Sequence, residues 1–407
     1  MNTANTTFPD SWDDLYKLDQ PLNFEAFLNS DLLAARRNQI NTRGIIYRIT
    51  GSVSTIASMC LVVHILRSHH GLSTTYHRLV FGLCIGDIMS SFANVLGSTM
   101  VPKEMNYFVP GAQGNMTTCT AQGFLINAGA NVVALYNCSI CLYYLAIIRY
   151  NKKDEYIRNK LEPWFHGITI IIPLVVGFIF MAMKAFNVNK SGCFIVPNNP
   201  PHCIGYENGD TPKGFNSIPC GRGDGGENPI LYLVTLIVGF GSPLIITPTV
   251  IVVTMLLMYR SVSKIEQRSQ NYGVMSLHLN ARSGGGNRGN NAATNSTRSK
   301  GIMSMTPRSL HHRDDQPRPT PSRSKSRATS QKRAILHMAT GYSLAWAFVF
   351  IPFMIALHES HVILISSACL TPLQGLFNFL VFMSPKVRNA MRPIRGRKNL
   401  TWRQAFI

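Results

Sequence analysis

Residues 119–148 read CTAQGFLINAGANVVALYNCSICLYYLAII and contain no Asp, Glu, Lys or Arg. A transmembrane helix needs about 20 mostly apolar residues to cross roughly 30 Å of hydrocarbon, so this stretch is long enough to span a membrane. Six further segments have a similar apolar character, at about 45–66, 79–99, 164–183, 229–259, 334–357 and 362–383. The sequence therefore predicts an all-α membrane protein, a seven-transmembrane helix bundle.

The charge content agrees with this class. Charged residues make up 14% of the chain, against roughly 25% in ordinary soluble domains. The net charge of +20 would suit a nucleic-acid-binding protein, but the basic residues lie between and after the apolar segments. Positive charge on one side of a lipid bilayer explains that distribution, and we expect no nucleic acid among the partners.

The loop charges predict the orientation in the membrane. Lys and Arg collect in alternate loops and in the tail, at Arg67, Arg78, Arg149, Lys152, Lys153, Arg158, Lys160 and within 384–407. Residues 1–35 carry several acidic residues against Lys17 alone. Because cytoplasmic loops are enriched in Lys and Arg, we expect the amino terminus outside and the carboxyl terminus inside the plasma membrane. Residues 1–44 show no cleavable signal peptide, so the first apolar segment is expected to act as a signal anchor.

The predicted organisation follows from these segments. It comprises an extracellular segment 1–44, helices one to five in 45–259, a disordered basic cytoplasmic loop 260–333, helices six and seven in 334–383, and a cytoplasmic tail 384–407. The loop is rich in Ser, Asn, Gly, Arg and Pro, a composition that buries too little apolar area to offset its ordering entropy. We expect only short helical extensions into it. Its part 323–330 suits basophilic kinases, or is a solvated linker near anionic lipid.

A short amphipathic helix is predicted after helix seven. Ser384 can cap it and Pro385 suits its first position. Val387, Met391 and Ile394 recur at helical spacing among cationic residues. This pattern is typical of a helix that lies on the inner leaflet.

Four cysteines face outward in this topology, namely Cys119, Cys193, Cys203 and Cys220. An even number on the oxidising side predicts two disulfides rather than free thiols. We expect one bridge between helix three and the second outer loop and another within that loop, but three pairings are open. Three outer sequons predict glycosylation at Asn5, Asn115 and Asn189.

Local motifs carry a family resemblance. Helix two reads LCIGD at 83–87, helix three begins CTAQGF at 119–124, and helix seven reads LQGLFNFLVF at 373–382. The L-x-x-x-D, C-x-x-Q-G-F and L-Q-G-x-x-N-F-L-V patterns resemble the cyclic-AMP-receptor-like G-protein-coupled receptors of protists and their plant and fungal relatives, over about 45–260 and 333–392. The resemblance implies an extracellular ligand, a heterotrimeric G protein, and kinases and arrestin-like proteins at the third inner loop.

Departures from rhodopsin-like receptors bear on the activation switch. The N-P-x-x-Y of helix seven and the C-W-x-P of helix six are absent. Arg149 follows helix three without the acidic neighbour of a D-R-Y motif, and is either a switch residue or an interfacial anchor. Tyr144 lies nearer the expected depth and is a second switch candidate.

Asp87 is the acidic residue expected well inside a span. A charge at the centre of a membrane helix costs at least about 2.5 kcal/mol, so Asp87 needs polar partners. Asn378, Ser90 and Ser91 are the candidates. We interpret Asp87 and Asn378 as a polar switch that changes partners on activation, with a static contact between helices as the alternative.

A ligand pocket is predicted to open outward between helices two, three, five, six and seven. Asn127 and Asn131 share one face of helix three, because residues four apart lie one above the other. The full set of candidate ligand-binding residues is Asn94, Asn127, Asn131, Tyr232, Trp346, Phe350 and His358. Each has helix packing as its alternative role.

Other membrane functions fit less well. A photosensory rhodopsin needs a retinal lysine in helix seven, and residues 362–383 contain no Lys. No metal-ligand cluster or nucleophile–base pair lies within the spans, so we expect no enzymatic activity and no cofactor. The prediction is a receptor that transmits ligand binding to a G protein, with a small-solute transporter as the alternative, although no internal repeat supports it.

Overall fold

The computed structural model describes residues 27–69, 71–189, 191–196, 201–204, 215, 217–223, 245–283 and 361–391, with single positions between 230 and 239 and between 336 and 347. The chain divides into two compact units, Met1–Met258 with Leu336–Ile407, and Tyr259–Ile335. The first unit contains the helix bundle and all the residues that position the candidate site.

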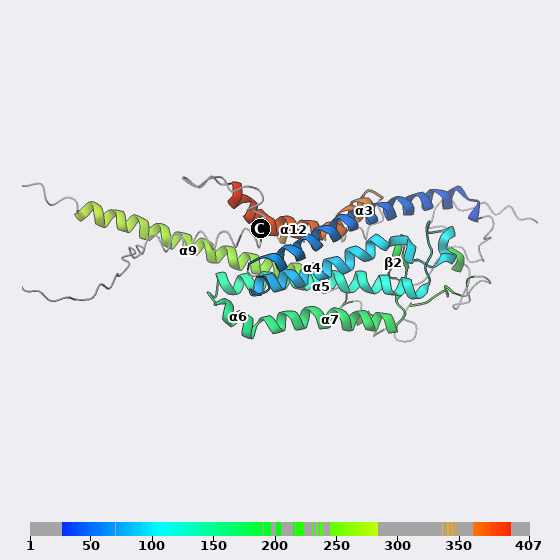
Figure 1. The fold of residues 1–407 in the computed structure, drawn as a ribbon, viewed down its shortest axis with the longest axis horizontal. Coiled ribbons are helices and arrows are strands. Elements are labelled where there is room, and N and C mark those ends of the chain that lie inside the picture. The colour runs from blue at the N-terminus through cyan, green and yellow to red at the C-terminus, as the bar shows by residue number, and fades with distance from the viewer. Residues whose placement is uncertain are drawn as a thin grey trace, which may run out of the picture. The chain divides into compact units, whose positions relative to one another are not determined.

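Four long helices run side by side in the first unit (Figure 1). They are α3 (Asp31–Arg67), α4 (Thr75–Leu96), α5 (Met116–Ile148) and α7 (Glu162–Ala182), with the short α6 (Asp154–Lys160) before α7. α4 packs against both α3 and α5, and α5 also packs against α7. α5 is the most buried of the four along its apolar stretch, so the stretch that decides the fold class also lies at the centre of this part of the bundle.

Three C-terminal elements belong to the described part of the bundle in the first unit: α11 (His361–Leu370), the 3₁₀ turn η5 (Thr371–Leu373) and α12 (Gln374–Met391). α9 (Thr247–Ser283) begins in the first unit and continues into the second. α11, η5 and α12 pack against α3, and α12 also packs against α4. The predicted seventh span therefore lies beside the first and the second.

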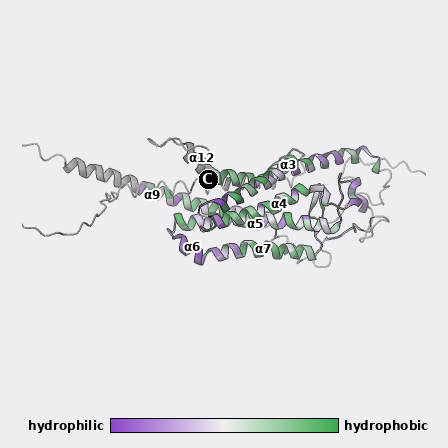
Figure 2. Cartoon of the chain, viewed as in Figure 1, coloured by the Kyte–Doolittle hydropathy of each residue, from purple (hydrophilic) through white to green (hydrophobic). Residues whose placement is uncertain are grey.

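The helices have the length and composition of membrane spans. Among the described residues, five are long and apolar enough to cross a membrane, namely Asp31–Arg67, Thr75–Met100, Met116–Ile148, Glu162–Ala182 and Thr247–Ile265, and Ala368–Ser384 is a shorter apolar helix. Figure 2 shows hydrophobic residues along α4, α5 and α7. Exposed aliphatic side chains such as Ile56 and Ile171 would face lipid. Most of the predicted sixth span lies outside the described residues.

α3 begins well before the predicted first span. Ser30 caps it, because its Oγ accepts a hydrogen bond from the Leu33 backbone N–H at 3.2 Å. Asp31 adds a negative charge in the first turn, where the helix dipole favours it. Residues 31–44, which were expected in the extracellular segment, are therefore helical, because the capping residues rather than apolar length set the start of this helix.

The C-terminal ends of α12 and α9 also differ from expectation. α12 continues through Ser384 and Pro385 to Met391, so the helix predicted after helix seven is an extension of it rather than a separate element. α9 continues to Ser283, far beyond the expected end of the fifth span. Residues 260–283 contain no Pro and only one Gly, at 273, so local helix propensity favours the longer helix.

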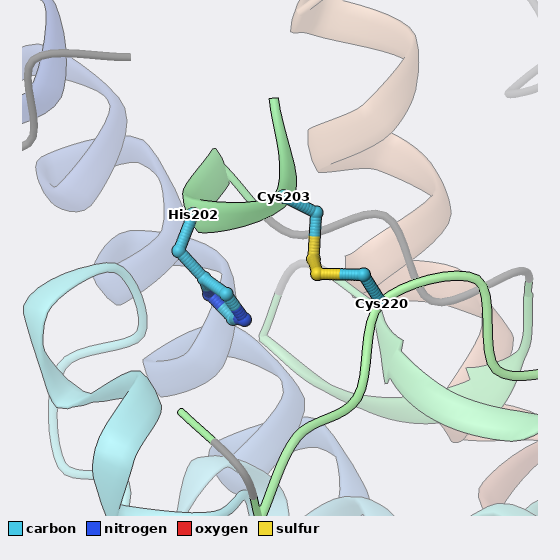
Figure 3. Close-up of side chains that lie close together, drawn as sticks. All are labelled: His202, Cys203 and Cys220. Atoms are coloured by element: carbon cyan, nitrogen blue, oxygen red, sulfur yellow. A yellow bond between two sulfur atoms is a disulfide. The ribbon is translucent and has the colours of Figure 1, made fainter. Parts of the chain in front are cut away.

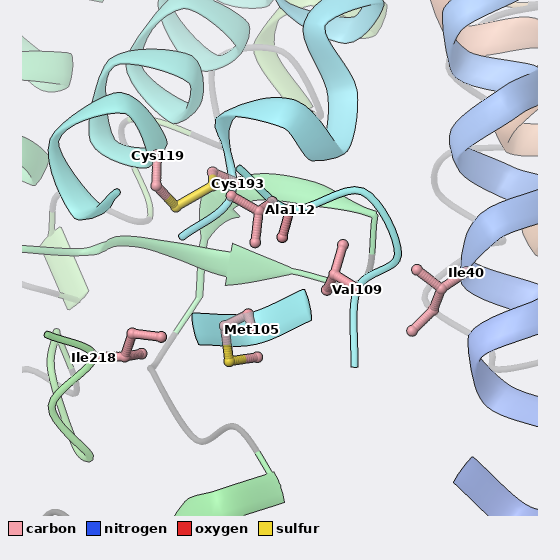
Figure 4. Close-up of a cluster of buried hydrophobic side chains, with 8 residues drawn as sticks. Ile40, Met105, Val109, Ala112, Cys119, Cys193 and Ile218 are labelled. Carbon is pink, nitrogen blue, oxygen red and sulfur yellow. A yellow bond between two sulfur atoms is a disulfide. The ribbon is translucent and has the colours of Figure 1, made fainter. Parts of the chain in front are cut away.

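The loops near the start of α5 form a second packed region. β1 (Phe186–Asn189) and β2 (Gly192–Ile195) pair as an antiparallel hairpin, and the 3₁₀ turns η1 (Gly97–Met100), η2 (Lys103–Tyr107) and η3 (Pro201–Cys203) accompany it. Figure 4 shows the cluster of buried side chains there: Ile40, Val101, Met105, Val109, Ala112, Cys119, Cys193 and Ile218. These loops are thus held by their own core, which joins α3, the start of α5 and the hairpin.

Candidate functional site

A carboxylate–amide contact lies in the middle of the bundle. Asn378 on α12 donates a hydrogen bond from Nδ2 to Oδ2 of Asp87 on α4, at 2.7 Å. Both side chains are buried, with 1% exposure each. The predicted contact between Asp87 and Asn378 is confirmed. Of the other proposed partners, Ser90 bonds the Asp87 backbone carbonyl and Ser91 bonds that of Pro372, so neither hydroxyl reaches the carboxylate.

Several buried polar atoms around this contact have no hydrogen-bond partner. They are Oδ1 of Asn378, Nε2 of Gln374 and Oγ of Ser58. Gly375 lies against the same part of α3, where its N–H donates to Ser54 Oγ at 3.0 Å and an added Cβ would lie 2.2 Å from Ser58 Oγ. An unpaired buried polar group costs about 1–3 kcal/mol, so this polar core has unused donors and acceptors that a change of partners would satisfy.

The candidate asparagines of the pocket bond to their own helices. Asn131 donates from Nδ2 to the Asn127 carbonyl at 2.9 Å and to Asn127 Oδ1 at 3.3 Å, and both residues are buried. Nδ2 of Asn127 is buried without a partner. Asn94 donates to the Ser90 carbonyl at 2.9 Å. Asn127 and Asn131 therefore meet as predicted, and Asn127 retains a donor for another group.

The two candidate switch residues at the end of α5 differ in their surroundings. Tyr144 is buried, with 4% exposure, beside the rings of Tyr76 at 5.8 Å and Tyr143 at 5.5 Å between centroids. The Tyr76 ring also stacks on Phe382 of α12, at 6.0 Å. Arg149 is exposed at the end of α5. The buried aromatic cluster joins α4, α5 and α12, which makes Tyr144 the better placed of the two for a role inside the bundle.

An ion pair between α4 and α7 was missed by the sequence analysis. Arg78 pairs with Glu162 through Nε and Nη2, the Nη2 contact being 2.7 Å. Thr75 also donates to Glu162 Oε2 at 2.8 Å. His166, one turn along α7, lies 3.5 Å from Glu162 and bonds the Tyr136 hydroxyl at 2.8 Å. We call Thr75, Arg78, Glu162 and His166 the ion-pair end.

The disulfides are those expected, and the structure selects the pairing. Cys119 at the start of α5 is bonded to Cys193 of β2, and Cys203 is bonded to Cys220 within the loop. The remaining cysteines, Cys60, Cys84, Cys138, Cys141 and Cys369, are free thiols. We call the region around the two bridges the disulfide end.

The C-x-x-Q-G-F pattern has a structural explanation. Gln122 has 1% exposure and uses both polar atoms: Nε2 donates to the carbonyls of Ala93 and Gly97 at 2.9 Å each, and Oε1 accepts from the Cys193 N–H at 3.1 Å. Gly123 admits Phe186, since an added Cβ would lie 2.7 Å from that ring. This motif thus joins α4, α5 and the hairpin.

A second group of buried polar contacts, made by Asn187 and Arg222, holds the hairpin in place. Asn187 has no solvent exposure, and its Nδ2 donates to the carbonyls of Lys184, Val196 and Arg222 at 2.9–3.0 Å. Arg222 donates from Nη1 to the Phe186 carbonyl and to Asn187 Oδ1. Burial lowers the pKa of Arg222 below its usual value. The sequence does not mark these residues as a pair because they are far apart along the chain.

His202, Cys203 and Cys220 lie together but do not form a metal site (Figure 3). The two sulfurs are bonded to each other, so neither is a thiolate ligand. The His202 ring bonds Tyr107 Oη at 2.9 Å and the Ile218 carbonyl at 3.4 Å, and it stacks on Phe215 with 4.2 Å between centroids. Burial lowers the pKa of His202 to about 4, so the ring is neutral at physiological pH.

Some predicted residues lie outside the described part of the chain. These are Tyr232, Trp346, Phe350 and His358 of the ligand-binding set and Asn5 of the glycosylation set. Asn115 is exposed and caps α5, accepting from the Thr118 N–H at 2.9 Å. Asn189 is partly exposed at the end of β1. Glycosylation of these two positions stays a prediction.

Comparison with known proteins identifies the fold. No protein-family model and no curated protein matches the chain. The crystal structure of squid rhodopsin is similar, with a TM-score of 0.52 and 11% sequence identity, over 88% of this chain and 80% of that chain. At this identity the likeness concerns the fold alone. The chain therefore has a seven-transmembrane helix-bundle fold like that of squid rhodopsin.

Proposed function

We propose that this protein is a cell-surface receptor that transmits the binding of an extracellular ligand to a cytoplasmic heterotrimeric G protein. The rhodopsin-like fold carries the proposal. Two features of the chain agree with it: a disulfide that ties the third helix to the second outer loop, and a buried carboxylate–amide contact between α4 and α12. Within this class, the motifs at 119–124 and 373–382 favour the cyclic-AMP-receptor-like family.

The charge pattern supports the orientation. The ion-pair end adjoins the basic segment after α5, with Arg149, Lys152 and Lys153, and positive loops stay in the cytoplasm. The disulfide end would then face the oxidising exterior. In this orientation the protein lies in the plasma membrane with its amino terminus outside, and the segment that follows α9 would be on the cytoplasmic side, where kinases and arrestin-like proteins act.

The proposed mechanism is a population shift at the polar core. A ligand changes the equilibrium only if it binds one state more tightly than the other. Asp87 and Asn378 join α4 to α12, and the Tyr76–Phe382 stack joins the same two helices nearer the ion-pair end. A ligand that moves α12 would exchange the Asp87 contact for the unpaired groups nearby, Gln374 and Ser58, and would separate the aromatic cluster to admit the G protein.

Guanine-nucleotide exchange on co-expressed Gα subunits tests this proposal. Membranes containing the native chain are compared with an Asp87→Asn variant, without ligand and with a panel that includes cyclic AMP. Asp31→Asn is the matched control, because it makes the same chemical change at an exposed position of α3. We expect exchange above that of empty membranes, lost in Asp87→Asn and retained in the control.

Surface expression of every variant has to be confirmed by labelling intact cells. If no condition produces exchange although the protein reaches the surface, coupling to those Gα subunits is contradicted. Solute uptake would then be measured, because a transporter is the second prediction from the sequence.

A further inference from the structure

A partly open cavity of about 150 Å³ lies beside α3 at the disulfide end. It is lined by polar and aliphatic groups from α3, η1 and the neighbouring loops: Ile40, Asn41, Gly44, Ile45, Arg48, Ser98, Pro110, Gly111 and Ser191. Arg48 is the one charged side chain in this lining. The cavity is separate from the Asp87–Asn378 core, since none of its lining residues takes part in that core.

Arg48 has unused hydrogen-bonding capacity in this cavity. Its Nη2 donates to Ser98 Oγ at 2.9 Å, whereas its Nε is buried and has no hydrogen-bond partner. No carboxylate of the described residues pairs with it. A guanidinium in a partly dry site is costly without an anionic partner, and its planar N–H groups match the two oxygens of a carboxylate or phosphate.

The backbone around Arg48 leaves the space open. Gly97 has a φ of +49°, and a Cβ there would lie 3.2 Å from Arg48 Nε. Gly44 lines the cavity, and among the described residues the nearest atom to an added Cβ there is Ser191 Cβ, at 3.8 Å. Glycine at 97 therefore avoids crowding the Arg48 guanidinium, and glycine at 44 leaves room in the cavity.

We infer that Arg48 and Ser98 form a binding site for an oxyanion, a carboxylate or phosphate group. Drug-sized ligands occupy pockets of about 300–1,000 Å³, so a cavity of about 150 Å³ holds a small anion or the anionic end of a larger molecule. Asn41 and Ser191 supply neutral hydrogen-bonding groups, and Ile40 supplies an apolar wall. That anionic group comes from a soluble ligand or from a lipid headgroup, and the experiment distinguishes the two.

The inference rests on the proposed receptor function only if the bound anion is the soluble ligand that activates the receptor. Binding itself is measured on the purified full-length chain without any G protein. Failure of anion binding and failure of G-protein coupling are therefore seen in different assays.

The test is thermal unfolding of the protein with its disulfides intact. In neutral maltoside micelles, sodium phosphate and sodium acetate are titrated against sodium chloride at equal ionic strength. In a second arm, the micelles are supplemented with phosphatidylglycerol. A ligand that binds the folded state raises the midpoint temperature in proportion to the logarithm of its concentration above the dissociation constant.

Three variants make the test specific. Arg48→Gln removes the guanidinium, and we expect affinity to fall by about 10- to 100-fold because hydrogen bonds to charged groups are lost. Gly44→Leu fills the cavity and leaves Arg48 in place, so it should also abolish the shift. Arg37→Gln, an exposed position on the same helix, removes the same charge and should bind like the native chain.

Each outcome decides the inference. Stabilisation by phosphate or acetate, lost in Arg48→Gln and in Gly44→Leu, establishes a site for a soluble oxyanion. Stabilisation by phosphatidylglycerol alone, with the same losses, establishes a lipid-headgroup site. Absence of any shift in the native chain, or an equal shift in Arg48→Gln and Arg37→Gln, overturns the inference; if Arg48→Gln does not fold, Gly44→Leu decides.

Discussion

The disulfide end and the ion-pair end of the bundle join neighbouring helices by different interactions. At the disulfide end, the Cys119–Cys193 bond and the neutral amide of Gln122 tie α4, α5 and the hairpin together. At the ion-pair end, Arg78 and Glu162 tie α4 to α7. A covalent bond and neutral hydrogen bonds hold one geometry over a wide range of conditions, whereas an ion pair responds to the loss of either charge.

This difference agrees with the proposed receptor function, in which one end would receive a ligand and the other would change shape. The polar core of Asp87 and Asn378 lies between the two ends. In the proposed mechanism, α12 would move on the side away from the disulfides, where ring contacts such as Tyr76–Phe382 are individually weak. The following four predictions test the contrast between the ends, starting with the largest effect.

Removal of the bridge between α5 and the hairpin should cost the most. In the chain-entropy model, the 74-residue separation of Cys119 and Cys193 predicts a loss of about 4 kcal/mol in the free energy of unfolding. The 17-residue separation of Cys203 and Cys220 predicts about 3 kcal/mol. Paired Cys→Ser variants, compared by thermal unfolding in detergent, check this order. A larger loss from the shorter loop would show that the first bridge is not the main constraint at this end.

Breaking the ion pair should have the next largest effect. Glu162→Gln leaves Arg78 without a carboxylate, and we expect a loss of about 2 kcal/mol, below the range for fully buried pairs because the Arg78 side chain is 25% exposed. Glu155→Gln, at an exposed position of α6, is the control. Adding Arg78→Gln to Glu162→Gln should recover part of the loss. Without such recovery in the double variant, the pairing of charges would not explain the stability of this end.

Gln122 provides a neutral counterpart at the disulfide end. Gln122→Leu keeps the volume but leaves the Cys193 N–H without its side-chain acceptor and removes one donor each from the Ala93 and Gly97 carbonyls, so we expect a loss of about 2 kcal/mol. Unlike the Glu162 variant, it should show the same loss at low and high salt, because no charge is removed. Unfolding midpoints at two salt concentrations measure both the stability loss and its dependence on salt. A salt-dependent loss for Gln122→Leu would contradict the assignment of neutral bonding to this end.

The smallest effect concerns pH in the loop. Burial lowers the pKa of His202 from 6.5 to about 4, so the folded loop favours the neutral ring. The contribution of this group to the stability of the folded loop is therefore fully present above the unfolded pKa of 6.5 and is lost as the pH falls towards 4. Between about pH 7.5 and 5.5 the loss should be about 1.4 kcal/mol, since one pKa unit corresponds to that free energy. Hydrogen exchange of amides in 217–223 measures it.

His202→Phe is the control for this pH effect. It keeps a ring against Phe215 but cannot titrate, so exchange in the loop should no longer depend on this group. If the protection factors of these amides, which correct for the slower intrinsic exchange at acidic pH, fall as much in His202→Phe as in the native chain, His202 is not the titrating group.

The fold was largely predictable because membrane spans are local features. The apolar stretch at 119–148 alone predicts a helix. The hydrocarbon core holds no water to bond the backbone N–H and C=O groups, and a single spanning segment can bond all of them internally only as a helix. Asn378 was one of three candidate partners named for Asp87 because a buried carboxylate needs a polar partner, and the structure selects it over Ser90 and Ser91. Helix ends were less predictable: Ser30 and Asp31 start α3 fourteen residues before position 45, and residues 260–283 extend α9.

The ion-pair end and the Arg48 cavity could not be derived from spacing. Arg78 and Glu162 are separated by more than 80 residues, and only the packing of α4 against α7 brings them together. Arg48 is visible inside the first apolar segment, and a charge in such a place is a signal for function. Its unpaired Nε and the cavity beside it depend on where η1 lies.

The sequence by itself determined the helical membrane class and the four cysteines that form bridges, because hydrophobic length and redox chemistry act locally. Only the tertiary structure decided which cysteines pair, which carboxylate meets which arginine, and that Gln122 rather than a loop residue joins α4 to the hairpin. Each of these contacts joins residues distant in sequence, and their geometry exists only after the helices have packed.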